Sequence, residues 1–105
     1  MENVVLGIDL GTSSVKIIAA NKQGHIIDQS SVPLTLIQPY PGYNEQDPED
    51  WVIAVKEGIK ILINRETMND KQISGLSFSG QMHGLVPLDH AYQPIRNAIL
   101  WNDTR

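Results

Sequence analysis

The chain has 105 residues, of which 41% are hydrophobic and 19% charged, and its formal net charge is −4. This is the composition of a folded domain, and the mild acidity argues against a nucleic-acid-binding surface, which would be basic. Cysteine is absent, which excludes disulfides, thiolate catalysis and cysteine-ligated zinc.

The sequence shows no targeting or membrane signal. The first residues lack the charged and apolar regions of a signal peptide, and no apolar run approaches the roughly 18 residues of a membrane-spanning helix. We therefore expect a cytoplasmic protein that binds neither a membrane nor nucleic acid.

The first third of the chain predicts three strands joined by tight turns. Apolar residues at 4–8 end at Asp9, and a polar turn separates them from a second strand at 15–20. A turn signal at 21–24 precedes a third strand at 25–32. Because short hairpin connections favour antiparallel pairing, this pattern predicts a three-stranded antiparallel meander.

The middle of the chain predicts an irregular loop and then a helix. Three prolines interrupt residues 33–47, after which Asp47 is a typical N-cap and Pro48 suits the first helical position. Gly58 weakens the middle of the helix by roughly 1 kcal/mol relative to alanine. The apolar residues that recur at helical spacing, and that we expect to form its buried face, are Trp51, Val52, Val55, Ile59, Leu62 and Ile63.

The last third predicts three more strands, at 73–79, 85–88 and 95–101. The element order is then β-β-β-α-β-β-β, which describes an α/β layer. The chain stops in a polar cluster at 101–105, whereas a domain more often ends on a closing helix or a disordered tail. We therefore expect a truncated domain.

The turn after the first strand is the first candidate site. Asp9, at the end of a buried strand, can hold a hydrated Mg²⁺ ion, and Gly11 lets the backbone approach an anion so that turn N–H groups can point at phosphate oxygens. A strand follows, so this is not a P-loop, and the isolated pattern also suits an ordinary hairpin. The remaining polar residues that would face phosphate are Thr12, Ser13, Ser14 and Lys16.

The segment Gly80–Gly84 is the second candidate site. Its two flanking glycines allow a sharp bend and a close approach to a ligand. His83 can hydrogen-bond a hydroxyl group, either as a binding residue or as a base, and Met82 offers an adaptable apolar surface. A Met-His pair in a loop also suits a purely structural role.

Four segments together resemble the FGGY family of carbohydrate kinases. They occur in the family's order and cover essentially the whole chain: Gly7–Lys16, Tyr43–Trp51, Phe78–Gly84 and Ile99–Arg105. The first also resembles the first phosphate motif of the actin, Hsp70 and sugar-kinase superfamily, and the last two are most similar to those of xylulokinases.

The resemblance implies an actin-like, ribonuclease-H-like fold. Residues 1–105 would be the amino-terminal part of the substrate-binding domain, and the ATP-binding domain and the general base would lie outside the chain. The implied activity is transfer of the ATP γ-phosphoryl group to a sugar hydroxyl, with D-xylulose as the expected sugar, and this chain alone is expected to be inactive.

The resemblance also assigns roles to residues. Asp9 would be associated with metal and phosphate, while Gly11, the hydroxyl residues of the turn and Lys16 would contact ATP. The residues that would contact or line the sugar site are Gln81, Met82, His83, Trp101, Asn102 and Asp103.

Three alternatives remain open. Gluconokinase or another pentulose kinase would share the same motifs. An actin- or Hsp70-like ATPase would share the phosphate turn but leaves the loop at Met82 and His83 without a purpose. The third is a non-enzymatic fragment with structural meaning only. Separately, Trp101 taken alone also suits a core position. Apolar surface left exposed on the sheet and helix would favour self-association or a homodimer.

Overall fold

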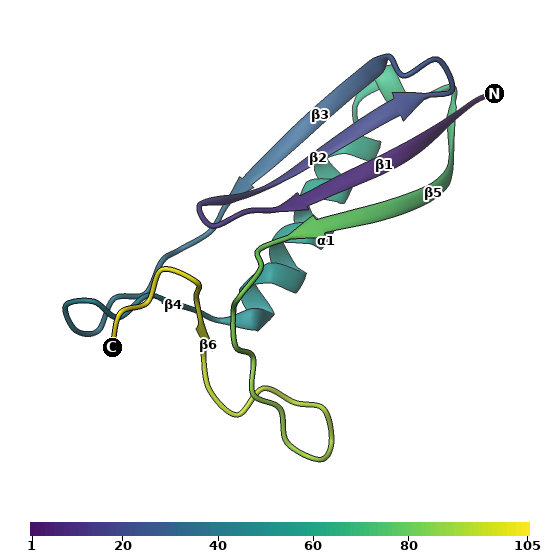
Figure 1. Cartoon of the computed structure of the whole chain (residues 1–105). Helices are drawn as coiled ribbons and strands as arrows, with labels where there is room; N and C mark the ends of the chain where they lie inside the picture. Colours follow the sequence, from purple (N-terminus) through teal and green to yellow (C-terminus); the bar gives the residue numbers. More distant parts are fainter.

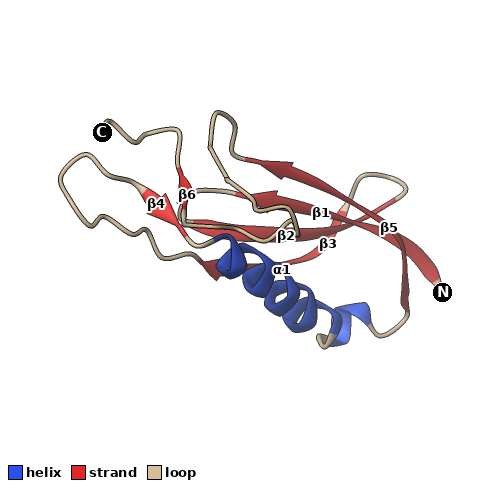
Figure 2. Cartoon of the chain, turned by 90° about the horizontal axis from the view of Figure 1, so that it is seen from below, coloured by secondary structure: helices blue, strands red, loops and turns tan.

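The computed structural model describes residues 1–105 and places one helix against one face of a four-stranded sheet (Figures 1 and 2). The sheet order is β3-β2-β1-β5, and β4 and β6 form a separate two-stranded sheet. The elements are β1 (Glu2–Leu10), β2 (Ser14–Asn21), β3 (Ile26–Pro33), β4 (Glu45–Gln46), α1 (Pro48–Ile63), the 3-10 helix η1 (Glu66–Met68), β5 (Lys71–Gly80) and β6 (Ala98–Ile99).

The predicted meander is confirmed. β1 pairs antiparallel with β2, and β2 pairs antiparallel with β3, whereas β5 returns beyond α1 and pairs parallel with β1. Alternate residues of each strand face α1, as the pleat requires. The core residues that β1 and β2 contribute to this face are Val4, Leu6, Ile8, Val15, Ile17 and Ala19.

The start of α1 agrees with its predicted cap. The Glu49 amide donates to the Asp47 carboxylate at 3.0 Å, which satisfies one of the free N–H groups of the first turn.

No helix in the structure has the length and apolar character needed to cross a membrane.

The predicted buried face of α1 is partly wrong. Leu62 is buried as predicted, but Val52 and Ile63 are 48% and 45% exposed. Ala54 and Gly58, which were not predicted to face the sheet, are buried instead. The small residues decide the orientation, because they let the helix backbone lie close to the sheet. The face that packs is therefore rotated towards the small side chains, which hydrophobic periodicity undercounts.

The last two predicted strands also differ. Residues 85–88 make only isolated bridges, Leu85 with Ile99 and Leu88 with Pro94, and the strand expected at 95–101 is reduced to Ala98–Ile99. Pro87 and Pro94 have no N–H to donate to a ladder. Between them the Asp89 carboxylate accepts from the amides of Ala91 and Gln93, at 2.8 and 3.0 Å, and holds a turn.

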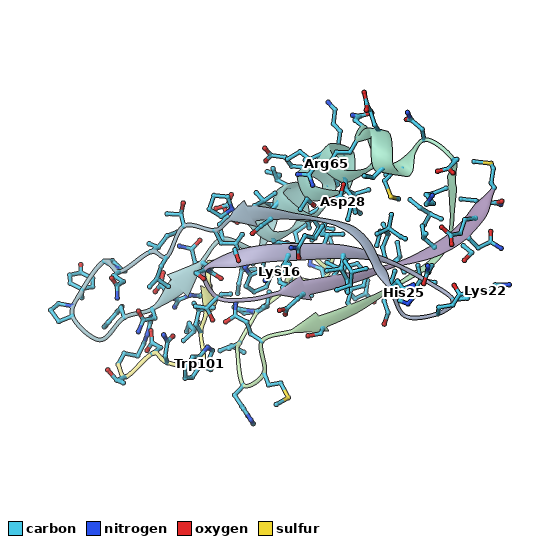
Figure 3. All side chains as sticks on the ribbon, turned by 90° about the horizontal axis from the view of Figure 1, so that it is seen from above. Lys16, Lys22, His25, Asp28, Arg65 and Trp101 are labelled. Carbon is cyan, nitrogen blue, oxygen red and sulfur yellow. The ribbon has the colours of Figure 1, made fainter.

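Several polar side chains lie away from the loops that follow β1 and β5. Arg65, just beyond α1, pairs with Asp28 of β3 at 2.8 Å (Figure 3). Lys22 and His25 lie by the turn between β2 and β3, at the opposite end of the sheet from Trp101 (Figure 3). His25 is exposed there.

The fold leaves an apolar groove between α1 and β5. Val52, Phe78 and Leu88 line it and are 48%, 61% and 48% exposed, and the groove encloses about 560 Å³. The radius of gyration is 16.0 Å, compared with about 13 Å for a compact domain of this size. The elongation comes from the segment after β5, which runs away from the sheet (Figure 1).

Candidate active site

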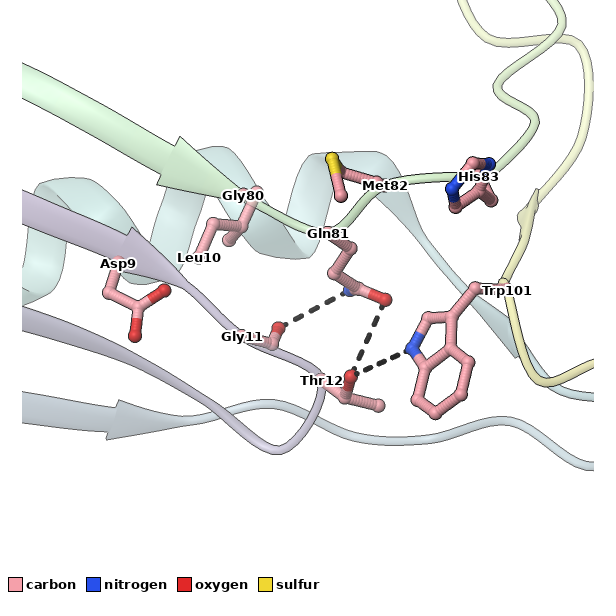
Figure 4. A pocket seen from close by; sticks show the side chains of 9 residues that line it. All are labelled: Asp9, Leu10, Gly11, Thr12, Gly80, Gln81, Met82, His83 and Trp101. Atoms are coloured by element: carbon pink, nitrogen blue, oxygen red, sulfur yellow. Dashed lines mark hydrogen bonds between the residues drawn. The ribbon is translucent and has the colours of Figure 1, made fainter.

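The two candidate segments meet at one edge of the sheet. β1 and β5 are parallel neighbours whose last paired residues are Leu10 and Gly80, so the turn after β1 and the loop after β5 start side by side. Ligands of open α/β sheets bind beyond the carboxyl ends of the strands. A pocket of about 340 Å³ lies here (Figure 4), lined by Asp9, Leu10, Gly11, Thr12, Gly80, Gln81, Met82, His83 and Trp101.

Asp9 and Lys16 lie on the sheet face that α1 leaves open. They are register partners across β1 and β2, and both are exposed. The Ser79 hydroxyl donates to the Asp9 carboxylate in a long contact of 3.4 Å. Together these residues place a carboxylate, an ammonium group and a hydroxyl along one hollow of the sheet.

The turn between β1 and β2 keeps free donors. The Gly11 amide closes the turn by donating to the Ser14 carbonyl at 3.0 Å, and a side chain at Gly11 would press on that same oxygen. The amides of Thr12 and Ser13 have no acceptor within the chain. Neighbouring free N–H groups in a turn are a typical anion-binding arrangement.

The pocket suits a hydrated cation. Asp9 is its only carboxylate, and no group of three or more potential metal ligands occurs in the chain. Mg²⁺ commonly keeps several waters and is held by one or two carboxylates together with substrate phosphates. The residues present therefore fit Mg²⁺ that arrives with a phosphate ligand.

Three exposed side chains form the other wall of the pocket. Met82 is 72% exposed, and His83 has a backbone φ of 60°, a left-handed conformation that is uncommon outside glycine. Trp101 is 58% exposed, so it is not a core residue, and its indole N–H donates to the Thr12 hydroxyl at 3.3 Å. An exposed indole beside Met82 and His83 can pack on the apolar face of a small polyol.

Gln81 joins the two walls. Its amide nitrogen donates to the Gly11 carbonyl at 3.3 Å and to the Gln46 side-chain oxygen at 3.1 Å, and its oxygen lies 3.5 Å from the Thr12 hydroxyl. The Gln81 side chain therefore forms its hydrogen bonds within the protein. Gln46 was not expected in the site. Its segment was noticed only through the family resemblance, because burial of a polar loop residue has no local sequence signal.

The pocket does not include Asn102 or Asp103. The Asp103 side chain is only 4% exposed and accepts from the Asn44 amide at 2.8 Å. The Asn102 carbonyl accepts from the Asn44 side chain at 2.9 Å, and the Asn102 side-chain oxygen is buried without a partner. Both residues anchor the segment that carries Trp101.

An ion-pair cluster fixes that segment to β4. Glu45, whose side chain is 8% exposed, binds Arg96 at 2.9 Å and Arg105 at 2.6 Å. Arg105 also pairs with Asp103 at 2.6 Å and stacks over the Tyr43 ring at 3.9 Å. Hydrogen bonding from Arg105 lowers the pKa of Glu45 and holds the pKa of Asp103 well below its usual value.

The cluster predicts that the segment 96–105 is released in acid. Lowered carboxyl pKa values mean that the pairing is fully present above about pH 5 and is lost as the pH falls through the folded-state values. These lie below the ordinary 3.8 for Asp103 and 4.5 for Glu45. In a pH titration by NMR, the Asn44 amide, which donates to Asp103, should hold its chemical shift down to pH 3.8 and change only below it.

The control is the Gly24 amide, whose acceptor, the Asn21 carbonyl, does not titrate. A midpoint for Asn44 at or above 3.8 would show that Asp103 is not held as an ion pair.

Comparisons with known proteins show which family has a similar sequence. Residues 4–105 match the N-terminal domain of the FGGY family of carbohydrate kinases. The chain is 57% identical over 105 residues to xylulose kinase of Staphylococcus epidermidis, covering 100% of this chain and 21% of that protein.

Two solved structures share the fold. A xylulose kinase from Rhodospirillum rubrum superposes with a TM-score of 0.90 at 28% identity, covering 97% of this chain and 21% of that one. A gluconate kinase from Lactobacillus acidophilus superposes with a TM-score of 0.89 at 31% sequence identity. The match covers 98% of this chain and 20% of that one. The expected actin-like, ribonuclease-H-like fold is confirmed by this likeness.

The chain thus spans about a fifth of the length of the relatives that it matches. The match nevertheless extends over nearly all of its own residues, including both walls of the pocket. The chain belongs to the FGGY family of carbohydrate kinases.

Proposed function

We propose that this chain is the amino-terminal part of a kinase that transfers the γ-phosphoryl group of ATP to a hydroxyl group of D-xylulose. The observation that carries the proposal is the meeting of the phosphate-facing turn and the loop with Met82 and His83 in one pocket. An ATPase without a sugar substrate has no use for the second wall. The relatives named xylulose kinase supply the choice of sugar.

The phosphate side of the pocket binds and orients ATP. The free amides of Thr12 and Ser13 donate to phosphate oxygens, the hydroxyl groups of the turn add donors, and Lys16 adds positive charge from the neighbouring strand. Bound Mg²⁺ would neutralise charge on the phosphates, and Asp9 is the residue that would hold it. Catalysis of phosphoryl transfer consists largely of such positioning and charge stabilisation.

The sugar side holds the acceptor. His83 can donate to or accept from a hydroxyl group, Met82 and the Trp101 indole pack on the apolar face of the sugar, and Gln81 keeps this wall in place. Asp9, the only carboxylate in the pocket, is assigned to the metal, and His83 is assigned to binding the sugar. The resemblance to the FGGY family implies that the group that accepts the sugar proton lies outside this chain. The isolated chain is therefore expected to be inactive.

The test uses a hybrid kinase, in which this chain replaces the 105 residues of the Staphylococcus epidermidis xylulose kinase with which it aligns. ADP release with Mg-ATP is measured with D-xylulose, D-ribulose, gluconate and glycerol, for the hybrid and for the isolated chain. Activity of the hybrid with D-xylulose alone, and none for the isolated chain, supports the proposal.

Other outcomes contradict the proposal in different ways. Gluconate is included because a gluconate kinase superposes as well as a xylulose kinase does, and a preference for it would correct the sugar. ATP hydrolysis that is indifferent to every sugar would instead favour an actin- or Hsp70-like ATPase. Steady ADP production by the isolated chain would show that it needs no group from outside.

A further inference from the structure

Gln46 is a buried polar residue at the centre of the hydrogen bonds around the pocket. Its side chain is 1% exposed and lies on β4, behind the lining residues. Its amide nitrogen donates to the Thr12 carbonyl at 2.6 Å. Its amide oxygen accepts from the Trp51 indole at 2.9 Å and from the Gln81 amide at 3.1 Å.

These partners fix which way the amide of Gln46 points. The Thr12 carbonyl can only accept, and the Trp51 indole can only donate, so nitrogen must face the turn and oxygen must face the helix. Only a side chain with a donor and an acceptor on one rigid group satisfies both. A carboxylate of the same shape would set an oxygen against the Thr12 carbonyl.

The three partners of Gln46 belong to three different elements. Thr12 is in the turn after β1, Trp51 is in the first part of α1, and Gln81 follows β5. Thr12 continues the chain of contacts, because its hydroxyl accepts from the Trp101 indole on the sugar wall. One buried amide therefore ties the phosphate-facing turn, the sugar-facing loop and the helix to each other.

We propose that Gln46 is a positioning residue that sets the spacing between the phosphate-facing turn and the sugar-facing loop. The inference rests on the proposed function. Gln46 is too deeply buried to touch either ligand, and it acts through Thr12 and Gln81. Since phosphoryl transfer depends on the placement of two reactants, its loss should affect the use of ATP and of sugar together.

The test is the substitution Gln46→Met in the hybrid kinase, which removes all three hydrogen bonds at similar volume and adds no charge. We expect kcat to fall roughly 10- to 100-fold, as for a reactant displaced by about 1 Å, and KM to rise for both Mg-ATP and D-xylulose. Steady-state kinetics and thermal unfolding are measured on the same preparations.

Ser30→Ala is the matched control. Ser30 is 5% exposed and donates to the Gly58 carbonyl at 2.8 Å, so its replacement also removes a buried hydrogen bond. That bond joins β3 to α1 and involves neither Gln46 nor a residue that lines the pocket. It should lower the melting temperature and leave kcat and both KM values of the folded protein unchanged. A second variant, Trp51→Phe, removes one of the three bonds of Gln46 and should lower kcat about fivefold, the factor of one net hydrogen bond.

The outcomes separate this inference from the proposed function. An unsubstituted hybrid that is inactive with every sugar contradicts the function and, with it, the inference. An active hybrid whose Gln46→Met variant keeps its kinetic constants overturns the inference alone. The inference would also be overturned if the Gln46→Met variant lost activity only in proportion to its loss of folded protein, as is expected for Ser30→Ala. If the Gln46→Met variant does not fold, unchanged kinetic constants in the Trp51→Phe variant would overturn the inference instead.

Discussion

Replacing Asp9 with asparagine in the hybrid kinase is expected to lower kcat about 10³-fold, because a metal ion contributes several kcal/mol to stabilising charge on a transferring phosphoryl group. Asparagine keeps the shape of the side chain and can still accept from Ser79. Asp9 is exposed and forms no ion pair, so the fold does not depend on its charge. The loss should therefore appear in catalysis without a change in melting temperature.

Asp28→Asn is the matched control for this prediction. Asp28 is also a strand carboxylate, but it pairs with Arg65 remote from the pocket. Its replacement should leave kcat unchanged. The Mg²⁺ concentration for half-maximal activity gives an independent measurement, because weaker metal binding in the Asp9→Asn variant should shift it upwards. A kcat for Asp9→Asn within tenfold of the unsubstituted hybrid would mean that the metal is held elsewhere.

The parts of the fold that the sequence predicted correctly are those specified by neighbouring residues. The hairpin between β1 and β2 and the turn before β3 have short-range signals, and the structure confirms both. The start of α1 was predicted for the same reason, since Asp47 and Pro48 act within one helical turn.

The parts that were missed depend on residues far apart in the chain. β4 and β6 are two residues each, and they pair across more than fifty positions, so neither has a strand pattern of its own. The burial of Gln46 has the same origin: Thr12, Trp51 and Gln81 reach it only after the sheet and helix have formed. Local periodicity cannot predict such contacts.

The candidate site shows the same division. Asp9, Thr12 and His83 were singled out from residue chemistry and resemblance, and the structure brings them to one pocket. Asp103 was grouped with them because the family resemblance assigns the segment from Trp101 to Arg105 to the sugar cleft, and in the structure its carboxylate pairs with Arg105. A resemblance that covers a whole segment does not distinguish Trp101, which lines the pocket, from Asp103, which anchors the segment.

The orientation of α1 depends on one glycine, which gives the prediction with the largest effect on stability. A Cβ atom at Gly58 would lie 2.7 Å from Ile17 Cδ1 and 3.5 Å from Val32 Cγ2, and both side chains belong to the core. Helix propensity favours replacing this glycine by about 1 kcal/mol. Packing opposes the change, because overfilling a close-packed core costs about 1–3 kcal/mol or more.

Packing should prevail for a side chain as large as leucine. Leucine adds four carbons where the first already overlaps, so Gly58→Leu is expected to destabilise the isolated chain by about 2 kcal/mol net in urea unfolding. The matched control is Gly75→Leu in β5, where a Cβ atom would meet nothing within 4 Å and stability should be maintained.

A displaced α1 should also reach the pocket, because Trp51 of this helix donates to Gln46. In the hybrid kinase, Gly58→Leu is therefore expected to lower kcat in the protein that remains folded. Ser30→Ala should not lower kcat, because it removes the hydrogen bond to the Gly58 carbonyl without pushing the helix away from the sheet. Equal stability of the two leucine variants would show that the small residues of α1 do not set its distance from the sheet. The difference between the predicted and the observed buried face of α1 would then have another cause.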